Sequence, residues 1–139
     1  MSYKIIGKYI KNLNFSIPNP KTFFLLTKNI ANYKINIDIR SNQVKENIFE
    51  VLTTLNLSTA KDVFEKINTK IEYATLIELS NKNIEKNEME KIVLIDVPSK
   101  IYGELRKIFV SLFENSGFKD IKISENVDFE SLYKKKKTQ

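Results

Sequence analysis

Acidic side chains are the main candidates for chemistry in this sequence, because the residue types on which most enzymes and metal sites depend are missing. None of the 139 residues is histidine or cysteine, which excludes thiol nucleophiles, serine–histidine triads, the usual zinc ligand sets and disulfide bonds. The 17 aspartate and glutamate residues form no paired constellation of the kind that acid–base catalysis needs. The sequence therefore predicts no enzyme, no metal site and no cofactor.

The other charged feature is a run of four lysines, Lys134 to Lys137. The formal net charge is +6, and subtracting these four lysines leaves +2 for the rest of the chain. Lysine outnumbers arginine 21 to 2, and a composition rich in lysine, asparagine and isoleucine is typical of an AT-rich genome. Because arginine makes the commonest specific contacts to base edges, no specific nucleic-acid binding is expected.

Apolar residues alternate with polar ones in four segments of the first half, which predicts four β-strands. The first runs from Tyr3 to Ile17, with a bulge near Lys11, and Pro18 and Pro20 end it. Its residues Tyr3, Ile5, Gly7, Tyr9, Leu13, Phe15 and Ile17 are expected on one face. The other runs are Ile35 to Ile39, Phe49 to Leu57 and Ile67 to Leu79. Short polar joins after Arg40 and Ser58 predict antiparallel neighbours in a meander, whereas the full strand order and the structure of Thr22 to Ile30 stay open.

The second half changes to helical spacing. Asn87 and Glu90 resemble a capping box at the start of one helix, which is expected to end at Pro98. Ser99 is expected to cap a second helix, and Gly117 to stop it in the left-handed conformation with Phe118 folded back. The apolar positions of that second helix are Ile101, Leu105, Ile108, Phe109, Leu112 and Phe113.

The last predicted element is a short helix that begins after Asp128, the expected N-cap. The chain is thus expected to form a single domain over residues 1–133, with strands at about 3–79, helices at about 87–133 and a basic, disordered tail at 134–139. No apolar run is long enough to span a bilayer and no signal peptide is recognisable, so a cytoplasmic location without stable membrane insertion is expected.

Two ordered sets of residues resemble the SecB family of bacterial protein-export chaperones. YIKNLNFSIPNP, from Tyr9 to Pro20, is similar to the family pattern Tyr-x-Lys-Asp-x-Ser-Phe-Glu-x-Pro-Asn. The second set comprises VPSKIYGELR from Val97, the pair Gly117 and Phe118, and VDFESLY from Val127 to Tyr133. It is similar to a proline-containing helix start, then Gly-Phe-Pro, then Asp-Phe-x-x-Leu-Tyr. A weaker match, YATLI, lies where the family has Tyr-Ala-Gly-x-Phe.

The resemblance implies an α+β fold, a four-stranded antiparallel sheet with helices on one face, assembled as a homotetramer made of two dimers. It implies a holdase that binds unfolded preproteins in a hydrophobic groove and needs no nucleotide. Carried over by position, the groove would include Phe23, Phe24, Ile35, Ile37, Ile39 and Phe118, with Leu132 and Tyr133 nearby. The dimer edge strand would carry Tyr3, Ile5, Tyr9, Leu13 and Phe15, and the helix between dimers Ile101, Leu105, Ile108, Phe109 and Leu112. For any single groove residue, ordinary core packing is the alternative.

Several positions depart from the family pattern. The family docks to the motor ATPase SecA through acidic residues on the outer face of the sheet, and the matching positions here are Asn12, Ser16 and Lys70. Loss of those acids removes attraction for the basic, zinc-bearing SecA tail, so SecA binding is expected to be possible but weakened. Gly103 and Glu104 replace a proline–aromatic pair, and the basic C-terminal run replaces an acidic tail.

Two other functions stay open at this point. One is a specialised SecB-like chaperone for a single client such as an antitoxin, which the lost acidic positions favour. The other is a small basic nucleic-acid-binding protein, for which the lysine run is the only supporting feature.

Overall fold

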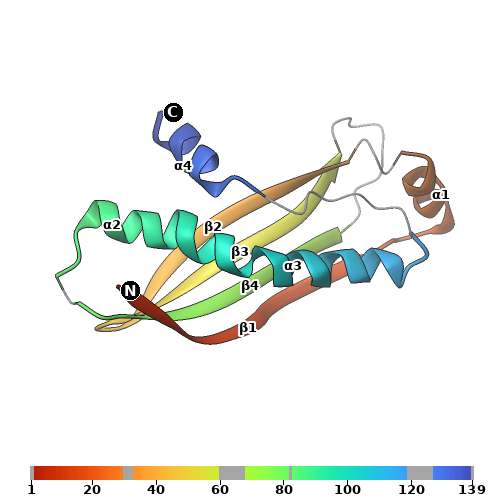
Figure 1. The fold of residues 1–139 in the computed structure, drawn as a ribbon. Helices are drawn as coiled ribbons and strands as arrows, with labels where there is room; N and C mark the ends of the chain where they lie inside the picture. Colours follow the sequence, from red (N-terminus) through yellow and green to blue (C-terminus); the bar gives the residue numbers. More distant parts are fainter. Residues whose placement is uncertain (1, 30–32, 60–67, 82, 119–126, 139) are drawn as a thin grey trace.

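A four-stranded antiparallel sheet with helices on one face forms the fold, as predicted (Figure 1). The computed structural model describes residues 2–29, 33–59, 68–81, 83–118 and 127–138. The strands are β1 (Tyr3–Ser16), β2 (Tyr33–Lys45), β3 (Ile48–Thr59) and β4 (Asn68–Leu79). The helical elements are α1 (Pro20–Asn29), α2 (Lys86–Lys91), the π-helical turn η2 (Ile92–Asp96), α3 (Val97–Glu114) and α4 (Phe129–Thr138). Within these described ranges, no helix has both the length and the apolar character needed to cross a membrane.

The strand order is β1-β4-β3-β2, and all neighbours are antiparallel. The predicted meander is confirmed for β2, β3 and β4. β1 lies next to β4, so β1 and β2 are the two edges of the sheet. β2 continues well beyond Ile39 to Lys45, because the polar residues after Arg40 keep pairing with β3 up to a tight hairpin. We call the sheet face under α2 and α3 the inner face and the opposite one the outer face.

Two bulges in β1 decide which of its side chains reach the inner face. The register of β1 against β4 shifts at Ile6 and again at Lys11, which confirms the predicted bulge near Lys11. Between the bulges the alternation is inverted, so Gly7 and Tyr9 pair with outer-face residues of β4 while Leu13 pairs with a buried core residue. The expectation that Gly7 and Tyr9 share a face with Leu13 is therefore wrong.

The segment between β1 and β2 that the sequence left open contains α1. The Thr22 N–H donates to Asn19 Oδ1 at 2.8 Å, so Asn19 caps the helix, and Pro20 occupies its first turn. The proline that ends the strand thus also starts a helix. Ile30, which the prediction included, lies outside the described residues.

One continuous helical segment replaces the two helices expected on either side of Pro98. The backbone is helical from Lys86 to Glu114, and the π-helical turn precedes the proline. In this turn the Val97 N–H bonds to the Ile92 carbonyl, five residues back. The wider turn leaves room for the proline ring, and the helix continues because proline lies in the first turn of α3. The Asn87–Glu90 capping box is also wrong, because α2 begins at Lys86 after Glu85 with no side-chain cap.

The end of α3 agrees with the sequence. Gly117 has φ +94°, and the Phe118 N–H donates to the Phe113 carbonyl at 2.9 Å. The Gly117 N–H donates to the Glu114 carbonyl at 3.1 Å, which completes a Schellman motif. The Phe118 ring lies 6.1 Å from the Phe113 ring, so the predicted fold-back is confirmed.

The N-cap of α4 is confirmed as well. The Ser131 N–H donates to Asp128 Oδ1 at 3.1 Å and the Ser131 hydroxyl donates to Oδ2 at 2.8 Å, which lowers the pKa of Asp128. The helix continues through Lys134 to Lys137 and ends at Thr138. These lysines were expected in a disordered tail. Lysine is a good helix former, and its charge is favourable near the C-terminal end of a helix dipole.

The core between sheet and helices consists of two clusters. One is centred on Leu105, Phe109 and Phe113 of α3, and the other on Val51, Ile77 and the residues around the π-helical turn. Thr53 on β3 and Thr75 on β4 lie along the strands between the two clusters. Both are fully buried, and their hydroxyls have no hydrogen-bond partner.

Candidate functional site

An aromatic group at the α1 end of the molecule is the largest exposed apolar feature among the predicted groove residues. Phe24 is 64% exposed. Its ring lies 5.8 Å from the ring of Phe23, which lies 5.1 Å from that of Phe118. Phe118 is buried, so it supports the other two rings from beneath. The structure thus brings the neighbouring residues Phe23 and Phe24 together with Phe118, which is distant in the sequence, and we call these three residues the aromatic end.

A row of isoleucines runs from this region along the edge strand β2. Ile35, Ile37 and Ile39 face inward, are partly exposed and pack against the core. β2 pairs with β3 on one side only, so among the described strands its other edge carries backbone groups without a ladder partner. The row therefore combines apolar side chains with a strand edge that pairs with no other described strand, which we call the open edge of β2.

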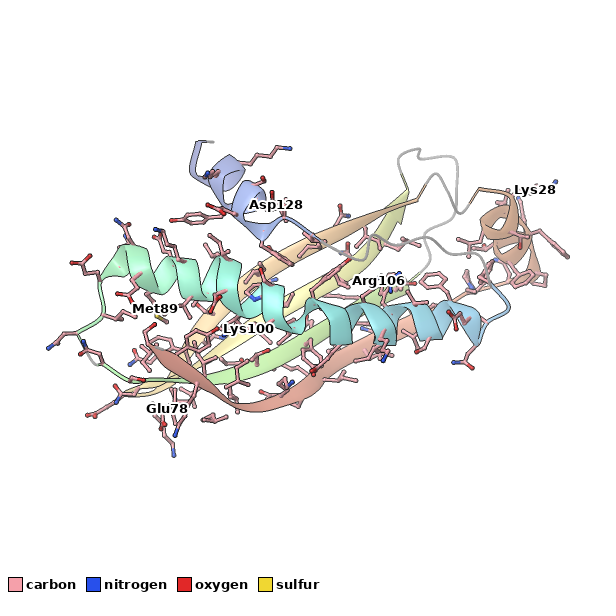
Figure 2. The ribbon with its side chains drawn as sticks, in the orientation of Figure 1. Lys28, Glu78, Met89, Lys100, Arg106 and Asp128 are labelled. Carbon is pink, nitrogen blue, oxygen red and sulfur yellow. The ribbon has the colours of Figure 1, made fainter. Side chains whose placement is uncertain are left out.

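The row ends at a cavity of about 460 Å³ between the β2–β3 hairpin and α2, which we call the hairpin cavity. Its apolar lining comes from the sheet and from the underside of α2, where Met89 faces the sheet (Figure 2). Its charged rim residues are Arg40, Glu46, Lys86 and Glu90. Sequence reasoning missed this cavity, because its walls come from three separated segments and only Ile39 belonged to the predicted groove.

α4 lies beside the π-helical turn that follows α2, and it places the last two predicted groove residues (Figure 1). The Tyr133 hydroxyl donates to Glu90 Oε2 at 2.6 Å, at the rim of the hairpin cavity. Leu132 is exposed, whereas Phe129 is buried with its ring 5.9 Å from that of Tyr102 on α3. Tyr133 thus lies near the hairpin cavity. The predicted groove residues are therefore divided between the aromatic end, where the isoleucine row begins, and the hairpin cavity, where it ends.

The predicted dimer strand β1 is an edge of the sheet, but its side chains have different environments. Tyr3 is buried, with its hydroxyl donating to Asp96, and the Phe15 ring packs 5.1 Å from the Phe113 ring. Ile5 is partly buried in the core. The exposed apolar residues of this strand are Ile6, Tyr9, Ile10 and Leu13, of which the sequence selected only Tyr9 and Leu13.

The predicted helix contact between dimers is also divided. Ile101, Leu105 and Phe109 are fully buried within this chain, while Ile108 and Leu112 are partly exposed. Glu104, which replaces an aromatic residue of the family pattern, accepts hydrogen bonds from Lys8 at 2.7 Å and from the Tyr73 hydroxyl at 3.0 Å. These two donors hold the pKa of Glu104 below its usual value. Glu104 therefore ties α3 to β1 and β4 within one subunit.

The outer face is rich in ion pairs. Asp38, Glu50, Glu72 and Glu78 each have a basic partner, and the distances are 3.1 Å to Arg40, 3.1 Å to Lys11, 3.1 Å to Lys70 and 3.2 Å to Lys4. Glu78 lies on the side away from the helices (Figure 2). The three predicted motor-docking positions share this face, since Asn12, Ser16 and Lys70 alternate with inward residues in the β1–β4 register.

Glu50 is the buried carboxylate of the outer face, and it connects three strands. It accepts hydrogen bonds from the Tyr9 hydroxyl and, through Oε1, from Lys11 at 3.1 Å and Asn42 at 3.5 Å. The Tyr9 hydroxyl is the main cause that lowers the pKa of Glu50, against the opposing effect of burial, and Lys11 adds to the lowering. The same hydrogen bond raises the pKa of Tyr9.

This geometry predicts an acid-sensitive part of the stability. Because the folded pKa of Glu50 lies below its ordinary value of 4.5, the contribution is complete above pH 4.5 and is lost as the pH falls through the folded pKa. Urea unfolding at a series of pH values should show a smaller acid-induced loss of stability in Glu50→Gln than in the wild type. Glu114→Gln, which changes an exposed carboxylate, is the control. An unchanged acid slope in Glu50→Gln would contradict the prediction.

Comparisons with known proteins agree with this architecture. The family described as preprotein translocase subunit SecB matches residues 1–139. A putative protein-export protein SecB from Pelagibacter ubique (strain HTCC1062) is 41% identical over 135 residues, which cover 97% of this chain and 96% of that protein. The protein-export protein SecB of Anaplasma phagocytophilum (strain HZ) is 23% identical over 144 residues, covering 95% and 90%.

The fold also matches a solved structure, a Mycobacterium tuberculosis SecB-like chaperone in complex with an antitoxin peptide. The TM-score is 0.59 at 11% identity, and the match covers 88% of this chain and 90% of that one. The sheet and its one-sided helices thus define a SecB-like chaperone fold. The chain belongs to the SecB family of protein-export chaperones. Because relatives matched over nearly their full lengths are named for protein export, this function is supported over the single-client alternative.

Proposed function

We propose that this chain is an ATP-independent holdase, which binds unfolded precursor proteins through its exposed apolar surface and keeps them competent for Sec-dependent export. The observation that carries the proposal is Phe24, a large aromatic side chain that is 64% exposed although its neighbours are packed. Burial of apolar area contributes about 25 cal/mol per Å² whatever the client sequence. Such a surface suits segments of many sequences and requires no nucleotide.

The binding groove in this proposal follows the inner side of β2 between the two ends described above. It includes the predicted residues Phe23, Phe24, Ile35, Ile37, Ile39, Phe118, Leu132 and Tyr133. Phe118 acts from beneath the aromatic end, since it is buried. The open edge of β2 offers backbone donors and acceptors to an extended client.

We further propose that the chain assembles as a homotetramer, a dimer of dimers. Exposed apolar residues on the edge strand β1 support the first contact, since a long edge that carries Ile6, Ile10 and Leu13 is otherwise a site for aggregation. The outward side of α3 supports the second, because Ile108 and Leu112 are partly exposed there. Light scattering should give a mass near that of four chains, and a stable monomer would contradict the assembly.

The partners in this proposal are unfolded preproteins, which the chain meets in the cytoplasm before their export. SecA is a weaker partner than for family members with acidic docking positions, and specific nucleic-acid binding is not part of the proposal.

The proposed groove predicts that Phe24→Ser weakens capture of unfolded proteins about tenfold, since a fully buried aromatic side chain contributes about 1.5–3 kcal/mol. The measurement is suppression of aggregation of several unrelated unfolded proteins. Lys21→Ala, which changes an exposed residue of the same helix, is the control. The holdase function is refuted if the wild type protects none of these proteins, and the placement of the groove is refuted if Phe24→Ser equals the wild type.

A further inference from the structure

The hairpin cavity has the size and lining of a binding site. Its volume of about 460 Å³ is roughly three times that of an engineered cavity of about 150 Å³ that binds benzene. Phe49, Leu79, Met89, Val93 and Leu94 contribute apolar surface. The rim carries charges of both signs, so it selects neither an anion nor a cation. The lining therefore suits uncharged, bulky apolar groups.

The position of the cavity indicates a polypeptide as the source of those groups. Ile39 belongs both to the inward row of β2 and to the cavity wall. Side chains on one face of an extended chain recur about every 6.6 Å. A client segment that follows the open edge of β2 past Ile35 and Ile37 therefore brings its next inward side chains to the cavity. Met89 is an adaptable wall residue, because methionine is flexible and polarisable.

The α2 part of the helical wall is weakly attached to the rest of the molecule, whereas Ile92 and Val93 of the π-helical turn are buried in the smaller core cluster. None of the six residues of α2 is buried, and a second cavity of about 410 Å³ lies against its other side and the π-helical turn. The turn joins α2 to the firmly packed α3. Wide helical turns of this kind are frequently found at functional sites.

The core beneath α2 and the π-helical turn is a cluster separate from the one beneath the rest of α3. Thr53 and Thr75 separate the cluster under α3 from the cluster that packs against the π-helical turn. Their buried hydroxyls lack hydrogen-bond partners, so contact across this division is less favourable than between apolar side chains. The cluster near the hairpin is thus placed to loosen without the larger one.

We propose that the hairpin cavity receives bulky apolar side chains of the unfolded client, and that α2 with the π-helical turn is the movable wall that admits them. The inference rests on the proposed holdase function. The Tyr133–Glu90 hydrogen bond restrains the wall in the absence of client. The site extends the predicted groove past Ile39 to the hairpin end of the sheet.

The test adds one charge to the cavity wall and measures binding of reduced, carboxymethylated α-lactalbumin, an unfolded protein that cannot refold. Met89→Glu is expected to bind it about tenfold more weakly, because burying a carboxylate among apolar side chains is unfavourable. Asn87→Glu is the matched control, since it adds the same charge to an exposed position of the same helix outside both cavities. If Met89→Glu fails to fold, Ile84→Glu, at a partly exposed wall position, replaces it.

Equal affinity of the Met89 and Asn87 variants would overturn the inference while leaving the holdase function in place. Absence of binding by the wild type would instead overturn the proposed function itself. The movable wall has its own measurement, hydrogen–deuterium exchange of the free wild-type protein. Amides of residues 86–96 should exchange faster than those of residues 101–113, and equal protection would refute the movement.

Discussion

Truncation of Phe113 to alanine is expected to lower the free energy of unfolding by about 3–5 kcal/mol, the range found for buried phenylalanines. Phe113 is fully buried, with its ring 5.1 Å from that of Phe15 on β1 and 5.3 Å from that of Phe109 on α3. Phe118 packs on the same ring. One side chain thus joins the edge strand, the long helix and the loop that supports the aromatic end, and alanine would leave a cavity that these elements cannot easily fill.

Urea unfolding at one fixed protein concentration measures the effect, because subunit association would otherwise change the apparent stability. Val110→Ala is the control, since this side chain of the same helix is partly exposed and its loss should cost roughly 1 kcal/mol. An equal loss in both variants would contradict the role given to Phe113. The Phe113 variant should also capture clients less well. Phe113 packs against Phe118, which packs against Phe23 beside Phe24, so loss of the Phe113 ring removes support from the aromatic end.

The features that the sequence predicted well are those whose signals lie within a few residues. Gly117 followed by Phe118 specifies a Schellman stop, and Asp128 three residues before Ser131 specifies an N-cap. The three-strand meander followed from alternation and short connections. In each case the local backbone requirement and the tertiary structure agree.

The features that were missed depend on residues distant in the sequence or on a signal with two meanings. Asn19 and Pro20 are an N-cap and a first-turn proline, but the same residues also mark the end of a strand. Pro98 breaks an ordinary helix and is tolerated here only after a wider turn. Alternation placed Tyr9 on the wrong face because a bulge at Ile6 has no signal of its own in the sequence.

The candidate site likewise has one part that the sequence predicted and one part that it did not. The sequence predicted the residues of the aromatic end through the family resemblance, in which Phe118 belongs to a matching motif and Phe23 and Phe24 were carried over by position. The hairpin cavity depends on how far β2 extends and on where α2 lies over the sheet. Neither is determined by local spacing, so no pattern in the sequence indicated the cavity.

The outer face carries the second prediction with a large expected effect, recovery of SecA binding by a change of charge. Lys70 is one of the three predicted motor-docking positions, and its ammonium group is also 3.1 Å from Glu72. Lys70→Glu would remove a like charge that opposes a basic SecA tail, add an acidic group and release Glu72 from its ion pair. The register places Asn12 opposite Glu72 on the neighbouring strand, so Asn12→Asp and Ser16→Glu would extend one acidic surface.

The triple variant Asn12→Asp, Ser16→Glu, Lys70→Glu should therefore bind a zinc-loaded cognate SecA tail peptide more than about tenfold more tightly than the wild type at low ionic strength. Each exposed opposite-charge pair contributes up to about 1 kcal/mol, and several act together here. The gain should shrink at high salt, where charges on a surface are screened.

Lys107→Glu changes the net charge by the same two units as Lys70→Glu but lies on the helical layer, so it should leave binding unchanged. If Lys107→Glu gives the same gain as Lys70→Glu, total charge rather than this surface controls the encounter. Tight zinc-dependent binding by the wild type would mean that the neutral positions Asn12 and Ser16 do not weaken SecA docking.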